Sequence, residues 1–66
     1  MNAYLISLSL GNLVVMEQSA MSAWVKCMTE EIELDDMFID REDLLERGYL
    51  RMETTTMSNV FLLIKE

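Results

Sequence analysis

The acidic segment from Glu30 to Glu46 constrains this chain most, because the rest of the fold must tolerate its one-signed electric field. Within it Arg41 is the only base, and apolar residues stand between the acids. Clustered like charges repel one another and cost stability. The segment therefore predicts either a solvated face or a binding surface for a basic partner. It holds nine of the twelve acidic residues of the chain: Glu30, Glu31, Glu33, Asp35, Asp36, Asp40, Glu42, Asp43 and Glu46.

The length of 66 residues allows one domain, spanning 1–66. A body of this size buries about 60% of the surface that its unfolded chain exposes, so a lone hydrophobic core is marginal. The hydrophobic content of 52% is high for such a body and leaves apolar surface outside. We therefore expect self-association, most simply as a homodimer.

The net charge of −7 and the sequence pI near 4.3 argue against direct binding to nucleic acid or to an anionic membrane, since both require clustered Lys and Arg. A host protein with a basic surface is the complementary partner. The single cysteine excludes an internal disulfide framework. The apolar opening at residues 3–10 is too short to span a bilayer and no charged segment precedes it, so we expect a cytoplasmic protein.

The first two strands are predicted from alternation. Residues 3–10 alternate in the β sense, Gly11-Asn12 has the composition of a two-residue turn, and residues 13–17 follow as a second strand. This hairpin would pair Leu10 with Leu13 and Leu8 with Val15. The face predicted to line the core carries Tyr4, Ile6, Leu8 and Leu10, and the opposite face, which a second subunit could cover, carries Ser7, Ser9, Val14 and Met16.

Ser19 is a predicted N-cap, after which the apolar spacing becomes helical. We expect a helix to about Leu34; the alternative ends it near Thr29 and makes residues 30–34 a short strand. A second short helix would be capped by Asp40 through the N–H of Asp43 and end at Gly48. The stripe expected to pack on the sheet, with Met21 and Met28 in the core, is Met21, Trp24, Val25, Met28 and Ile32.

Residues 49–54 alternate again, residues 55–59 have the composition of a hairpin loop, and the apolar run Val60 to Ile64 predicts a fourth strand. The predicted fold is α+β, a small antiparallel sheet in the order β-β-α-α-β-β with the helices on one face. A strand apolar on both faces is central or lies at a subunit interface. The residues predicted to form the dimer interface are Val60, Leu62, Leu63 and Ile64.

The residue types needed for most catalysis are missing. There is no histidine, one cysteine and two glycines, so no thiolate cluster or phosphate-binding loop can form. The acids around Asp40 lack the spacing and turn glycine of a calcium loop. Cys27, beside Lys26, is best interpreted as a small buried hydrophobe. We expect no enzyme activity, no metal site and no cofactor.

The partner-binding site is predicted within the acidic segment, where charge would steer association and Met37 and Phe38 would provide apolar anchors. Carboxylates three or four positions apart on a helix have spacings comparable with those of phosphates along a strand, which permits nucleic-acid mimicry. The predicted site consists of Asp35, Asp36, Met37, Phe38, Asp40, Glu42 and Asp43.

In overall form the chain resembles the small acidic proteins with which bacteriophages and mobile elements block host defences, including anti-restriction and anti-CRISPR inhibitors. The features that carry this resemblance are the short single domain, the acidic run from Glu30 to Glu46, the strand opening MNAYLI and the absence of catalytic residues. The resemblance implies inhibition of a host protein by occlusion or as a DNA mimic, often as a homodimer in the host cytoplasm. Two alternatives are an antitoxin-like or regulatory partner protein and an assembly subunit of a larger complex.

Overall fold

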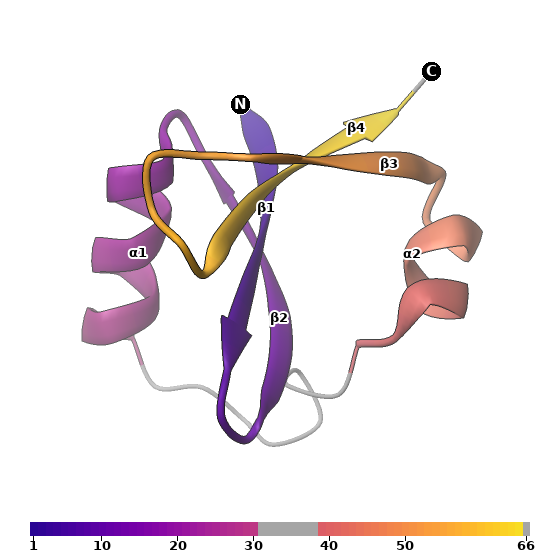
Figure 1. The fold of residues 1–66 in the computed structure, drawn as a ribbon. Coiled ribbons are helices and arrows are strands. Elements are labelled where there is room, and N and C mark those ends of the chain that lie inside the picture. Colours follow the sequence, from indigo (N-terminus) through magenta and orange to yellow (C-terminus); the bar gives the residue numbers. More distant parts are fainter. Residues whose placement is uncertain (31–38, 66) are drawn as a thin grey trace.

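The computed structural model describes residues 1–30 and 39–65 and contains four strands and two helices. The strands form one antiparallel sheet in the spatial order β2-β1-β4-β3, so β1 and β4 are central and β2 and β3 are the edges. The predicted element order and antiparallel sheet are confirmed (Figure 1). In chain order the elements are β1 (Asn2–Leu8), β2 (Gly11–Glu17), α1 (Ala20–Thr29), α2 (Arg41–Glu46), β3 (Tyr49–Thr54) and β4 (Val60–Lys65).

The β1–β2 hairpin turns two residues earlier than the sequence predicts. Ile6 lies opposite Leu13 and Leu8 opposite Gly11, so the connecting residues are Ser9 and Leu10. Gly11 takes the positive φ of +149°, and no other residue type in the described ranges has a positive φ. The predicted pairings of Leu10 with Leu13 and of Leu8 with Val15 are therefore wrong. The backbone freedom of Gly11 is used at the start of β2 rather than inside the turn, and Leu10 is left exposed at the hairpin tip.

The two helices lie on opposite faces of the sheet, which corrects the prediction that both cover one face (Figure 1). The cause is β1, whose side chains are buried on both faces. Tyr4 and Ile6 point to the face that α1 covers, whereas Ala3 and Leu5 point to the face that α2 covers. A central strand that is apolar on both sides needs a cover on each. Leu44 of α2, together with Ile39, supplies the second cover from within the same chain.

Helix α1 begins as predicted. The N–H of Ser22 donates to Oγ of Ser19 at 3.1 Å, which satisfies one of the free donors of the first turn. The helix ends at Thr29, because Glu30 is already extended at φ −93° and ψ 150°. The predicted continuation to Leu34 is thus wrong, and the alternative end near Thr29 is right. The strand that this alternative placed at 30–34 lies largely outside the described residues.

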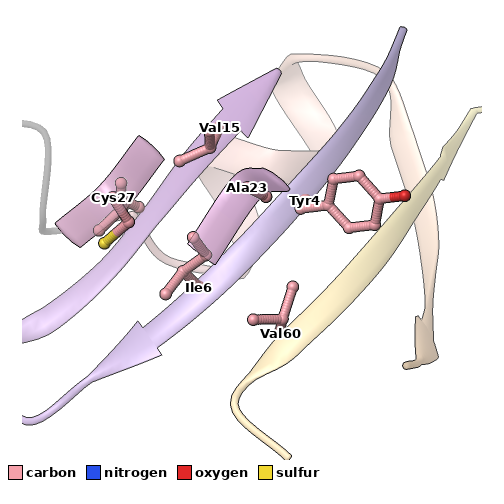
Figure 2. Close-up of a cluster of buried hydrophobic side chains, with 7 residues drawn as sticks. Tyr4, Ile6, Val15, Ala23, Cys27 and Val60 are labelled. Atoms are coloured by element: carbon pink, nitrogen blue, oxygen red, sulfur yellow. The ribbon is translucent and has the colours of Figure 1, made fainter. Parts of the chain in front are cut away.

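The packed face of α1 consists of small residues rather than methionines. Ala23 is completely buried and Cys27 nearly so, and both lie over Ile6 and Val15 (Figure 2). Ala20 and Trp24 pack at the margin of this cluster. Small side chains let a helix approach a sheet closely. The prediction that Met21 and Met28 belong to the core is therefore wrong, and both face outward.

Helix α2 is short and begins with a reciprocal capping box. The N–H of Asp43 donates to Oδ1 of Asp40 at 3.0 Å, and the N–H of Asp40 donates to Oδ2 of Asp43 at 3.1 Å. The predicted cap is confirmed. Arg47 ends the helix, and Gly48 at φ +91° turns the chain into β3, as a C′ glycine does.

Strand β4 pairs with β1 on one side and with β3 on the other. Its first residue, Val60, is completely buried, and Leu63 belongs to the cluster on the opposite face. The predicted loop at 55–59 is confirmed, and Oγ1 of Thr55 organises it by donating to the carbonyl of Val60 at 2.8 Å. The apolar run thus forms a central strand.

Candidate protein-docking surface

The outward face of α1 is an apolar stripe of Met21, Val25 and Met28, which we call the α1 stripe. These residues follow each other at i, i+4 and i+7 and so lie along one side of the helix. Their exposed fractions are 61%, 50% and 65%. The opposite side of the same helix packs on the sheet through Ala23 and Cys27. Helix α1 is thus apolar on two sides, and among the described residues no element covers the outer one.

Acidic groups flank the α1 stripe. Glu17, at the end of β2, and Glu30, at the C-cap, line the same shallow depression as Met21 and Val25. Lys26 is the one base in that lining, and its Nζ lies 3.9 Å from the carboxylate of Glu17. The C-terminal end of a helix also carries a partial negative charge. The stripe therefore ends in a negative field, which in the sequence continues with four more acids between residues 31 and 36.

A second apolar depression lies between α2 and β3, and we call it the α2–β3 groove. It has a volume of about 420 Å³. Its floor contains the buried residues Leu5 and Leu63, and its rim contains the exposed side chains of Leu45, Leu50 and Met52. The groove has a mixed rim, since Asp40, Arg41 and Arg51 also line it. The groove can therefore make apolar contacts, but its rim carries charges of both signs.

The predicted acidic site is only partly within the described residues. Asp35, Asp36, Met37 and Phe38 lie outside them. Glu42 is exposed on α2. Asp40 and Asp43 have their carboxylates engaged in the capping box, so part of their hydrogen-bonding capacity serves α2 itself. The structure gives these two aspartates a local role in the fold.

Two of the four residues predicted to form a dimer interface on β4 are inaccessible to a partner. Val60 and Leu63 are buried within the chain, Leu62 packs against the cluster under α1, and Ile64 is half-buried. The two helices cover a run that would otherwise need a partner. The other predicted contact face, Ser7, Ser9, Val14 and Met16, is partly covered as well, since Val14 packs against the cluster under α2.

The described residues do not bring together a set of side chains suited to binding a metal ion. No group of three or more carboxylate or thiol side chains in the described ranges is placed to hold a metal ion. Burial of Cys27 among apolar side chains raises the pKa of its thiol, which works against a nucleophilic thiolate. None of the described helices is both long and apolar enough to cross a membrane.

The sequence predicts the residues of the α1 stripe as part of an apolar stripe but wrongly places them against the sheet, because two apolar stripes overlap on one helix. The spacing of Met21, Val25 and Met28 is as regular as that of Ala20, Ala23 and Cys27, and the larger residues looked like the core. The size of the side chains could have shown which stripe packs on the sheet, since a helix lying close to a sheet favours small residues at the contact. Large flexible side chains are then left for the outer face, and methionine is common at binding surfaces.

Comparison of this chain with protein-family models, with curated protein sequences and with solved structures found no match.

Proposed function

We propose that this protein is a small acidic binding module that covers a basic surface of a partner protein, and that it acts as an inhibitor of a host defence or nucleic-acid-handling protein. It has no catalytic role in this proposal. The observation that carries it is the α1 stripe, three apolar side chains on an exposed helix face that is bordered by Glu17 and Glu30. Apolar anchors beside a rim in which acids outnumber bases, Glu17 and Glu30 against Lys26, suit a protein surface of opposite charge.

The carboxylates and the apolar side chains are expected to affect different steps of binding. Exposed carboxylates attract a basic surface over about a Debye length, roughly 10 Å at 0.1 M salt, and so mainly raise the association rate. The methionines and Val25 lose contact with water on docking and so mainly slow dissociation. In this proposal the α1 stripe takes the anchoring role that the sequence assigned to Met37 and Phe38, and the acids from Glu30 onward provide the steering.

Capture and kinetics test this proposal together. Immobilised wild-type chain is used to isolate partners from cells of its source, and the identified partner is then purified for binding measurements. We expect Met21→Ala/Met28→Ala to raise Kd by at least about tenfold through faster dissociation. Glu30→Lys should instead slow association and reduce its salt dependence. Leu10→Ala is the matched control, because Leu10 is as exposed as Met28, at 65%, but lies at the hairpin tip.

The outcomes separate the possible roles. Unchanged binding by both variants would remove the α1 stripe and its acidic border from consideration. A captured enzyme of host defence whose activity falls on binding supports the inhibitor role. If the captured partner is a toxin or a structural subunit, the protein is still a binding module, but its role is then antitoxin-like or one of assembly.

A further inference from the structure

Among the described residues, no element covers the outer edge of strand β3. The sheet order leaves it paired with β4 alone, and five of its six residues are exposed. The backbone N–H and C=O groups on the outer side of such a strand are free to pair with another strand. The other edge strand, β2, is also paired on one side only, but its one charged residue is Glu17, so its sequence has no self-complementary pair of charges. The described contacts of α1 are with β1, β2 and β4, whereas α2 contacts β3.

The charges on this edge are arranged symmetrically about one residue. Met52 lies between Arg51 and Glu53, whose side chains are 63% and 50% exposed and 3.7 Å apart. An exposed ion pair of this kind contributes little to the stability of the monomer. The strand as a whole has no net charge, although the chain carries −7. It is therefore an edge at which two copies of this acidic chain can approach without local repulsion.

A two-fold axis through Met52, perpendicular to the sheet, makes these charges complementary. In antiparallel pairing about this axis, Arg51 lies opposite Glu53 of the second copy, and Glu53 lies opposite Arg51 of that copy. An axis through Arg51 or through Glu53 would instead place like charges directly opposite each other. Opposite charges across a strand pair stabilise it, and like charges destabilise it. The charge pattern thus selects one register, which overlaps residues 50–54.

The other face of the same strand supports this register. Met52 lies opposite Leu63 in the β3–β4 pair, and both line the α2–β3 groove. On the two-fold axis Met52 would meet its own copy beside this groove, where Leu45 and Leu50 are exposed. Pairing would therefore bury apolar side chains on one face and join two ion pairs on the other.

We propose that two copies of this chain associate through β3 in this register and form a continuous antiparallel sheet of eight strands. We choose a second copy of the chain as the partner of this edge, because the charges on β3 are complementary to themselves about a two-fold axis. Such an axis relates the two subunits of a symmetric dimer. This interface differs from the β4 interface expected from the sequence. It also lies apart from the α1 stripe, so it leaves the proposed partner-docking surface free.

Charge reversal tests the register directly, with sedimentation equilibrium as the measurement. Wild type should show twice the chain mass of 7.7 kDa as its concentration rises. R51E and E53R should each raise the dimer Kd about 30-fold, equivalent to about 2 kcal/mol, because each places two like-charge pairs across the axis. An equimolar mixture of the two variants should dimerise again, since position 51 of one then meets an opposite charge at position 53 of the other. The double variant R51E/E53R should dimerise like wild type.

Two controls keep the result interpretable. Both substituted side chains are exposed, so melting curves of R51E and E53R should remain cooperative. Arg47→Glu makes the same charge change at an exposed position outside β3 and should leave the dimer Kd within about threefold. A wild-type mass of one chain up to millimolar concentration would overturn the proposal, and so would a mixture that stays monomeric. Neither result bears on partner capture by the α1 stripe.

Discussion

The thiol of Cys27 is a titratable group whose acidity is changed by burial. It lies among Ile6, Val15 and Ala23 under α1 (Figure 2). Burial there raises its pKa, because an apolar surrounding disfavours the thiolate. In the unfolded chain the thiol ionises near its ordinary pKa of about 8.5. The folded state therefore holds its proton to higher pH than the unfolded state does.

This difference predicts a loss of stability on the alkaline side. Below about pH 8.5 both states are protonated and the free energy of unfolding is unaffected by the thiol; as pH rises above this value, the unfolded state loses its proton first and gains stability. Urea titrations of wild type and Cys27→Ala between neutral and alkaline pH measure the effect. We expect the stability of wild type to fall more steeply with pH than that of the variant. Parallel pH profiles would contradict the assignment.

At the scale of the element, α1 shows that residue size decided which of two apolar stripes packs on the sheet. Ala23 is completely buried in the same cluster as Ile6. Ala23→Leu should lower the free energy of unfolding by about 1 to 3 kcal/mol through overpacking. Met21→Ala and Met28→Ala should each change it by no more than about 0.5 kcal/mol, because both side chains are exposed.

Denaturant titration of these three variants distinguishes the two faces of α1. A large loss for Met21→Ala or Met28→Ala, together with a neutral Ala23→Leu, would mean that the helix packs through its outer stripe. The same variants are used in the capture experiment. If a Met21 or Met28 variant keeps its free energy of unfolding but no longer binds the partner, the α1 stripe is the docking surface.

At the scale of the whole molecule, charge is distributed unevenly along the chain. The described residues carry seven acids and five bases, a net charge of −2; residues 31–38 contribute −4 and Glu66 contributes −1, which together give −7. Most of the uncompensated charge therefore belongs to a short part of the sequence. It follows α1 directly, at the acidic end of the α1 stripe.

Self-repulsion of this charge predicts that salt stabilises the protein. Screening at 0.1 M salt reduces interactions beyond about 10 Å, so Tm should rise between low and moderate salt. Thermal melts at one protein concentration measure this, and a second salt series at tenfold lower concentration shows how much of the change comes from dimerisation. Asp35→Asn/Asp36→Asn should flatten the dependence, and Lys65→Gln, which adds net negative charge, should steepen it. A Tm that falls or stays constant with salt would mean that specific ion pairs balance the acids.

The sequence by itself determined the features that depend on neighbouring residues. The order of the elements follows from local periodicity. The caps at Ser19 and Asp40 determine where the two helices begin, and Gly48 determines how the chain leaves α2. Each of these rests on hydrogen bonds or backbone angles within a few residues, so a short window of sequence contains all the information.

The tertiary structure alone decided the features that depend on distant segments. Both faces of β1 carry apolar residues, and only the positions of Ala23 and Leu44 show that one helix covers each face. The hairpin register, the central place of β4 and the exposure of Met21 and Met28 depend in the same way on what packs against them. Burial is a property of the assembled chain, because the same apolar side chain stabilises a core when covered and offers a docking surface when left in water.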